Sequence, residues 1–346
     1  MATEADGLTP ESLARFWAWW ASARDRVAAS VDKQTLTKHV AQEVTSAVDS
    51  LHPSIVWVLG PGRSARHALT LSAEGDLSVR RLTAAWLRSA PAPDESWEFH
   101  AARPAAQHPH LDVDGREFSP GDFRVAHVYD DGSERFHVTL YHPEFESAQD
   151  AVRRQVAFLT VDQLLGEDEV ERWLGTVEVA TAPPAEAVPL DEFRGQMEQR
   201  RTSATGHKFS LGHGLDHRGS PAVLMFNTAL KQIDHLDHVF HLAVFFRLHA
   251  PRPDGLPGAE EAEQLNKVED RLLEGLGDNG LLIGRLTLAA RREIHFYVRD
   301  AEAAEQAIAD WRTQADAWGA NHSIEPDPTW SFLEDGFSRP LAPREP

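Results

Sequence analysis

The chain has 346 residues and is strongly acidic, since 54 aspartates and glutamates against 34 lysines and arginines give a formal charge of −20 at pH 7. It contains no cysteine, which excludes disulfide scaffolds, Cys-ligated zinc, iron–sulfur clusters and thiol nucleophiles. The negative charge disfavours contact with phosphate backbones, so we expect no nucleic-acid partner. The chain also has 18 histidines, whose protonation below about pH 6.5 would remove most of this charge.

Length and composition indicate a globular protein of two or three domains. An apolar content of 42% with 25% charged residues is ordinary for such a protein. No stretch approaches the ~18–20 apolar residues of a transmembrane helix, and the N-terminal MATEADGLTP has neither the basic start nor the apolar run of a signal peptide. We therefore expect a cytoplasmic protein with no membrane partner.

The first hundred residues predict an α+β module. Apolar residues recur at three- and four-residue spacing after Pro10, which indicates an amphipathic helix, and a second helix is predicted over 34–51. The apolar run at 55–58, a glycine-rich cluster and an alternating segment at 67–71 predict a β-hairpin. A helix over 77–89 and a strand over 96–102 complete the module, which spans about 10–105.

A similar order of elements follows. Alternating segments at 123–129 and 136–141 predict a second hairpin, and a helix is predicted over 147–165. The second module would therefore span about 106–180, so that 1–180 forms an N-terminal α+β region. Three prolines within seven residues then predict a linker, with a short helix, over 181–204.

The second half gives the clearest topological signal. Its predicted elements are strands at 223–226 and 239–248, a helix at 259–276, strands at 281–288 and 292–299, a helix at 301–318 and a strand at 321–325. From Val239 the order is βαββαβ, which predicts a ferredoxin-like C-terminal domain over 205–346. The whole chain is thus expected to be an α+β protein of two or three ferredoxin-like modules. Their antiparallel sheets would be covered by helices on one face, leaving the other face open for binding.

Histidines are concentrated in one part of this second half, between residues 207 and 249, with three aspartates among them. Imidazole and carboxylate groups are ligands for zinc and other divalent ions. The candidate ligands are His213, His217, His235, His238 and His241. Their spacing matches no established metal motif, and His238 and His241 would point to opposite faces of a strand. We expect no cofactor, and a divalent metal bound by these histidines is the alternative.

Other catalytic motifs are absent from the sequence. The chain has no Gly-x-Ser-x-Gly nucleophile elbow. The segment Gly60-Pro61-Gly62-Arg63-Ser64 resembles a phosphate loop only in following a strand, because it lacks the Gly-x-x-x-x-Gly-Lys-Ser/Thr spacing and precedes a strand. We interpret it as the turn of the first hairpin.

Six short segments of the second half, in their order and spacing, resemble the bacterial family catalogued as domain of unknown function 695. They are Pro221–Leu230, Val244–Phe246, Leu265–Leu272, Leu282–Thr287, Arg292–Val298 and Asp327–Trp330. The likeness covers about 205–338, and segments near Phe16, Leu51 and Leu164 resemble the N-terminal region that often accompanies this domain. The C-terminal domain of the family is similar to the bacterial regulator of ribonuclease activity B, which inhibits ribonuclease E by binding it. The resemblance therefore implies protein binding or regulation, and it implies no catalytic residues.

The expected function is that of a non-catalytic, cytoplasmic binding or regulatory protein with a basic protein partner. An acidic sheet face or a groove between modules would make the contact, and the sequence leaves the oligomeric state open. The candidate ligand or partner contacts are Arg285, Tyr297 and Trp330. Arg285 and Tyr297 could face the open side of the sheet, and Trp330 would otherwise cover an edge of the core. The alternatives are a metal-binding protein or metal-dependent hydrolase that uses the histidines, and an immunity or stress-response protein.

Overall fold

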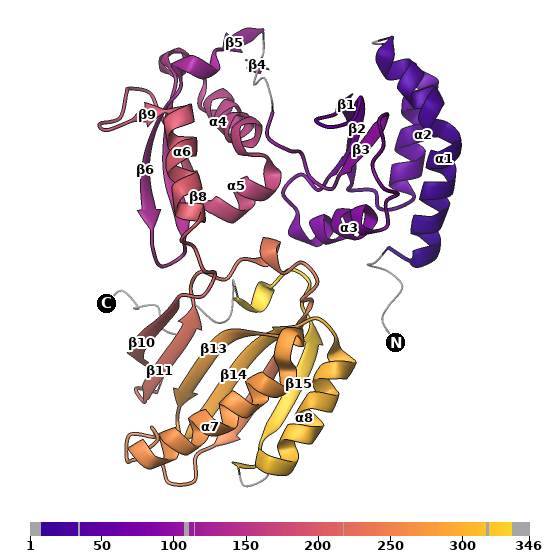
Figure 1. The fold of residues 1–346 in the computed structure, drawn as a ribbon. Coiled ribbons are helices and arrows are strands. Elements are labelled where there is room, and N and C mark those ends of the chain that lie inside the picture. Colours follow the sequence, from indigo (N-terminus) through magenta and orange to yellow (C-terminus); the bar gives the residue numbers. More distant parts are fainter. Residues whose placement is uncertain are drawn as a thin grey trace. The chain divides into compact units, whose positions relative to one another are not determined.

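The computed structural model describes residues 8–33, 35–106, 111–113, 115–216, 218–315 and 318–333. The chain divides into two compact units, the second of which takes in Asp131–Glu134 and the residues from Thr205 onward, and the first the remainder. Both units combine helices with sheets (Figure 1), which confirms the predicted α+β class. Over the described ranges, no helix has the length and apolar character needed to cross a membrane.

The first half of the first unit has the predicted elements. They are α1 (Pro10–Asp32), α2 (Lys38–Asp49), β1 (Val56–Pro61), β2 (His67–Ser72), α3 (Leu77–Arg88) and β3 (Trp97–His100). Thr9 caps α1 by accepting a hydrogen bond from the Ser12 amide. The sheet order is β1-β2-β3, with β3 parallel to β2. Its core includes the buried rings of Trp20, Trp86 and Trp97.

The second half of the first unit forms another small sheet of order β8-β7-β6-β9 and a β4–β5 hairpin. Its elements are β4 (Leu111–Val113), β5 (Arg116–Phe118), β6 (Arg124–Asp130), β7 (Arg135–Tyr141), α4 (Asp150–Leu165), α5 (Glu167–Trp173), β8 (Leu174–Ala180), β9 (Val188–Pro189) and α6 (Leu190–Arg201), with short 3₁₀ helices at Pro120–Asp122 and Pro143–Glu146. Within 181–204, predicted as a linker with a short helix, β9 pairs with β6, and α6 buries Phe193 and Met197 in the core. The division between the units falls after Ala204.

The second unit is built on one six-stranded antiparallel sheet, in the order β10-β11-β13-β14-β12-β15. Its elements are β10 (Phe209–Leu215), β11 (Pro221–Asn227), β12 (Phe240–Arg247), α7 (Ala259–Leu276), β13 (Gly280–Leu288), β14 (Arg291–Val298), α8 (Ala301–Ala315) and β15 (Asn321–Pro326), with 3₁₀ turns at Gln232–Asp234 and Gly277–Asn279. From β12 onward the order is βαββαβ, as predicted. Strand β10 was not predicted.

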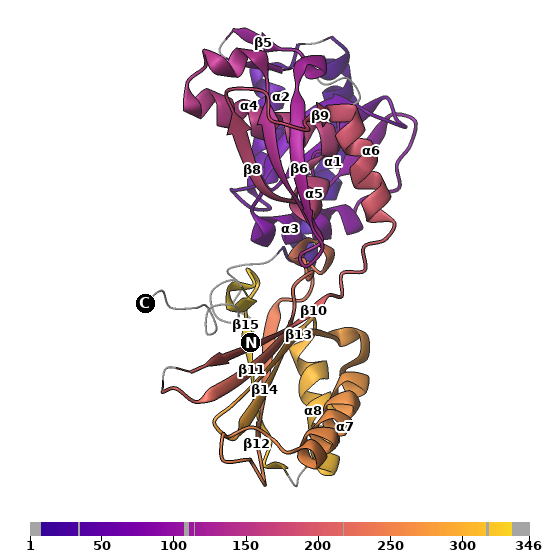
Figure 2. The ribbon, with the colours of Figure 1, turned by 90° about the vertical axis from the view of Figure 1, so that its left-hand side faces the viewer.

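The two faces of this sheet have separate cores. Figure 2 shows α7 and α8 on the same side of the sheet, where Leu242, Leu265 and Phe296 are fully buried with their neighbours. On the opposite face, Ile283, Tyr297 and Trp330 form a second, smaller cluster. The prediction that this second face is open is wrong at its centre, because the segment after β15 packs against it.

Candidate functional site

The four candidate histidine ligands that the structure describes do not form a cluster. His213 lies on β10, His241 on β12, and His235 and His238 lie in the loop between β11 and β12; His217 is outside the described residues. The rings of His235 and His238 are neighbours, with centroids 5.5 Å apart. In the described part of the chain, no three histidine, aspartate or glutamate side chains are placed so that they could hold a metal ion together.

His241 instead pairs with a histidine outside the predicted set. Its Nε2 lies 3.1 Å from Nδ1 of His295, and the two rings are stacked. The ring of Phe332 stacks on His241 with a centroid distance of 3.7 Å. Burial, and secondly the neighbouring His295, lower the pKa of His241 to about 4, although Asp327 opposes this shift.

Because His241 is partly buried with a lowered pKa, we expect the stability of the second unit to be sensitive to acid. His241 has its pKa near 6.5 when unfolded and about 4 when folded, so its contribution is fully present above pH 6.5 and is lost as the pH falls toward 4. We expect a loss of roughly 1–2 kcal/mol between pH 7 and pH 5, allowing for partial exposure of the ring. Denaturant unfolding at pH 7 and at pH 5 measures this loss of unfolding free energy. The loss between the two pH values should be smaller for His241→Gln than for the wild type. An unchanged pH dependence in His241→Gln would contradict the assignment, and His39→Gln on the surface of α2 is the control.

The segment over the second sheet face, residues 327–333, is held by one carboxylate. Asp327 Oδ1 accepts hydrogen bonds from the amide and hydroxyl of Ser331 at 2.9 and 2.8 Å. Its Oδ2 accepts them from the Tyr297 hydroxyl at 2.9 Å and the Phe332 amide at 3.0 Å. Burial alone would raise the pKa of Asp327, but these hydrogen bonds outweigh it and lower the pKa below its usual value. We call residues 327–333 the C-terminal strap.

Tyr297 and Trp330 form the centre of the strap contact. Their rings stack with centroids 4.2 Å apart, and both side chains are almost completely buried. Trp330 Nε1 also donates a hydrogen bond to the His238 carbonyl at 2.7 Å. Tyr297 therefore lies on the face that we predicted, but the strap covers it, and Trp330 packs over the sheet face.

Arg285 lies on the helix-covered face, opposite to the face on which it was expected. Its guanidinium is 2.8 Å from Glu269 on α7. Arg292 lies 2.6 Å from the other oxygen of the same carboxylate, and both Glu269 and Arg292 are buried. A bulge between Leu282 and Gly284 shifts the register of β13 and reverses its alternation. The resulting ion-pair triad connects α7 with β13 and β14.

The outer surface of α7 and α8 carries a large excess of negative charge. Seven of its exposed residues are acidic: Glu260, Glu263, Asp270, Glu274, Glu302, Glu305 and Asp310. Only Lys267 and Arg271 are exposed bases on these two helices, and Lys267 pairs with Glu263 at 2.8 Å. We call this surface the acidic helical layer. Its charge is directed to solvent, whereas Glu269 on the inner side of α7 is neutralised by arginines.

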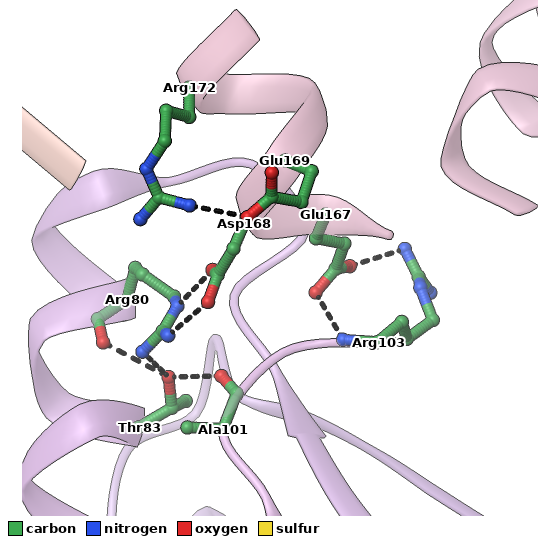
Figure 3. Close-up of polar contacts among 8 residues, drawn as sticks. All are labelled: Arg80, Thr83, Ala101, Arg103, Glu167, Asp168, Glu169 and Arg172. Atoms are coloured by element: carbon green, nitrogen blue, oxygen red, sulfur yellow. Dashed lines mark hydrogen bonds and ion pairs between the residues drawn. The ribbon is translucent and has the colours of Figure 1, made fainter. Parts of the chain in front are cut away.

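The first unit contains a polar junction between α3, α5 and the chain after β3 (Figure 3). Arg80 binds Asp168 with two parallel hydrogen bonds of 2.7 Å, the bidentate geometry that is strongest for this pair. Glu167 accepts hydrogen bonds from the backbone amide of Arg103 at 2.8 Å and from the Ser72 hydroxyl at 2.6 Å. The junction joins the two halves of the first unit.

Two further groups complete this junction. Glu169 on α5 accepts hydrogen bonds from Arg172 at 2.6 Å and from the Trp173 indole at 2.9 Å. Burial, and secondly the charge of Glu167, raise the pKa of Asp162 on α4 to about 6. A groove of about 360 Å³ beside the junction is lined by Arg63, Arg80, His100, Arg103 and Arg194 together with acidic and apolar residues. Arg80 and Arg103 are already paired with carboxylates, which favours a structural role for this site.

The glycine-containing turn of the first hairpin encloses a carboxylate of the protein itself. Glu98 on β3 accepts hydrogen bonds from the amides of Arg63, Ser64 and Ala65 at 2.7, 2.8 and 3.0 Å and from the Ser64 hydroxyl at 2.5 Å. Burial alone would raise the pKa of Glu98, but these bonds hold it well below its usual range. The turn is therefore an amide nest for an internal anion.

The sequence interpretation missed Glu269, Asp327 and His295. All three are polar residues beside apolar runs, and only their distant partners in the chain make them important. The spacing Asp327-x-x-x-Ser331 gave one local signal, because aspartate side chains often accept hydrogen bonds from nearby backbone amides in turns.

Comparison with known proteins gives one match. Residues 216–335 match the model of a family described as "Family of unknown function (DUF695)". The match includes the strap, the ion-pair triad and the acidic helical layer, and β10 lies before it. No curated protein and no solved structure matches the chain.

Proposed function

We propose that this chain is a non-catalytic, cytoplasmic protein that regulates a basic protein partner by binding it. The observation that carries this proposal is the acidic helical layer. Its two neighbouring helices, α7 and α8, expose seven acidic residues but only two basic ones. A net excess of charge of one sign on a surface steers an oppositely charged partner and selects against others. The match of residues 216–335 to a family of unknown function is compatible with this role and assigns no reaction.

Four buried or partly buried carboxylates are held by groups of the protein itself, which supports a binding role. Glu98, Glu167, Glu269 and Asp327 each accept at least two hydrogen bonds or ion pairs from the protein itself. Such groups stabilise the fold, whereas a general acid or base needs access to a substrate. The sequence resembles family 695, whose C-terminal domain is similar to the regulator of ribonuclease activity B, a protein that acts by binding. This resemblance points to the same class of function.

Charge reversal on the acidic helical layer tests this proposal. The variant Asp270→Lys/Glu274→Lys/Asp310→Lys places lysines in the middle or toward the C-terminal ends of α7 and α8, where the helix dipole tolerates positive charge. We expect the wild-type protein to retain a basic protein from lysate of its native cell at about 0.05 M salt and to release it at about 0.5 M. The triple variant should retain less than about a tenth of that amount.

A matched control has the same change in net charge on the first unit. The exposed residues Asp25, Asp49 and Asp191 lie on helices there, and their replacement by lysine should leave binding within about twofold of wild type. If the layer variant and the control variant lost partner binding equally, the effect would be one of net charge and not of the acidic helical layer. Full retention by the layer variant, or turnover of a substrate by purified protein with no partner bound, would refute the proposal.

A further inference from the structure

Strand β10 presents an unusual apolar surface. Its odd-numbered residues Phe209, Leu211 and Leu215 are 44%, 62% and 63% exposed. Leu211 is the register partner of Met225 on β11, which in turn is the partner of Arg285. Because directly opposed residues share a face, these side chains lie on the face that α7 covers further along the sheet. Figure 1 shows β10 as the outer strand, on the side away from α8.

Among the described residues, the backbone of β10 pairs with a neighbouring strand on one side only. The amide of Thr228 donates to the carbonyl of Lys208, and the amide of Asp216 donates to the carbonyl of Ser220. Even-numbered residues from 208 to 216 therefore direct their amides and carbonyls at β11, and the odd-numbered residues direct theirs outward. Among the described strands only β11 pairs with β10. The strand contains no lysine, proline or bulge, which are the usual protection of a free edge.

The sequence of β10 is suited to antiparallel pairing with itself. With Gly212 opposite Gly212 of a second copy, Phe209 lies opposite Leu215 and Leu211 opposite His213. These are pairs of outward-directed residues, so each exchanges two backbone hydrogen bonds. The register uses the full length Phe209–Leu215 and is symmetric about its middle residue, as a two-fold axis requires.

Charges at the ends of the strand complement each other in the same register. Lys208 precedes β10 and Asp216 follows it. In the self-paired arrangement, Lys208 of one copy lies opposite Asp216 of the other, at both ends of the contact. Between them the only titratable side chain is His213. A chain with a net charge of −20 is repelled by its own copies over most of its surface, but this edge brings no two acids together.

We propose that two copies of this chain form a dimer by antiparallel pairing of β10 with β10, which joins their six-stranded sheets into one. The contact combines the unpaired edge, the exposed apolar side chains and the end charges. It uses a different surface from the acidic helical layer, so it is independent of the proposed function.

Measurement of molar mass by light scattering tests the dimer. At about 100 µM, a concentration suited to a contact of this modest size, we expect the full-length protein to have twice its 38.5 kDa chain mass. Leu211→Lys places a charge beside the centre of the contact and should weaken association at least about tenfold. The control is Val128→Lys on β6, which replaces another strongly exposed apolar residue (68% exposed) and should leave the dimer intact. Unfolding curves show whether each variant is folded.

Cysteine cross-linking tests the register independently. The chain has no cysteine of its own, so Gly212→Cys introduces a single thiol next to the two-fold axis. The two Cα atoms of such a pair are about 4.5 Å apart, within disulfide range, and mild oxidation should give a covalent dimer. Ser210→Cys is the matched control, because its two copies are offset by four residues, about 13 Å, and should not cross-link. A monomeric wild type overturns the proposal, and so does a dimer that survives Leu211→Lys or cross-links equally at both positions.

Discussion

Replacing Glu269 by alanine is expected to lower the free energy of unfolding of the second unit by about 3–5 kcal/mol. The reason is the charge that the substitution leaves behind. Arg292 has only 6% of its surface exposed and donates to Glu269 at 2.6 Å and to the Thr287 hydroxyl at 3.0 Å. Without the carboxylate, a buried guanidinium loses its counter-charge. Arg285, whose side chain is 29% exposed, can be hydrated and contributes less.

Two comparison variants make this prediction specific to burial. Glu263→Ala removes an exposed carboxylate from the same helix, where it pairs with Lys267, and should change stability little. Glu269→Met/Arg292→Met removes both buried charges and should recover much of the loss, because apolar side chains of similar size replace them. Denaturant unfolding followed by circular dichroism gives the three values. Equal effects of Glu269→Ala and Glu263→Ala would show that the triad contributes no more than a surface pair.

Replacing Trp330 by alanine is the second large effect that we expect, at about 3–5 kcal/mol. The indole is 2% exposed, stacks on Tyr297 and donates a hydrogen bond to the His238 carbonyl. Trp330→Phe keeps a ring against Tyr297 and loses that hydrogen bond, so a smaller loss of about 1–2 kcal/mol is expected. Denaturant unfolding of the wild type, Trp330→Phe and Trp330→Ala should give free energies of unfolding that decrease in this order.

A second measurement shows whether the strap itself is released in Trp330→Ala. Phe332 covers the ring of His241 in the folded protein, so loss of the strap should expose the imidazole to water. The pKa of His241, followed by NMR, should then rise from about 4 toward the ordinary value of about 6.5. A destabilised variant in which the pKa of His241 stays near 4 would show a damaged core with the strap still in place.

The sequence predicted most helices and the longer hairpin strands because their apolar periodicity is strong, but it did not predict β4, β5, β8 and β9 of the first unit. The helix at 259–276 and the strands at 281–288 and 292–299 agree with α7, β13 and β14 to within about a residue. Strand β10 was not predicted because two of its seven residues are glycines, and its three apolar side chains are exposed and do not mark a buried face. The register shift after Leu282 placed Arg285 on the unexpected face, and periodicity alone does not reveal a bulge.

The site residues were less accessible to sequence reasoning than the fold. A dense group of histidines suggested a shared site, but the sheet separates His213 on an edge strand from His241 on a central one. The partner of His241 is His295, 54 positions away in the chain. Such pairs depend on strand order, whereas local spacing was the only guide available for the histidines. The Pro-rich stretch had the composition of a linker, yet Phe193 and Met197 just beyond it provide an apolar face that packs into the first unit.

The amide nest around Glu98 has a consequence for ligand specificity. Three amides and a hydroxyl converge on one point, which is the arrangement that elsewhere captures phosphate or sulfate. Here the occupant is covalently attached, so it competes at a high effective concentration with any anion in solution. The nest therefore binds a carboxylate of its own chain. It prefers this carboxylate because Glu98 is covalently attached, and not because its intrinsic affinity for carboxylates is high. A turn with the geometry of a small-anion binding site thus connects the β1–β2 hairpin to β3.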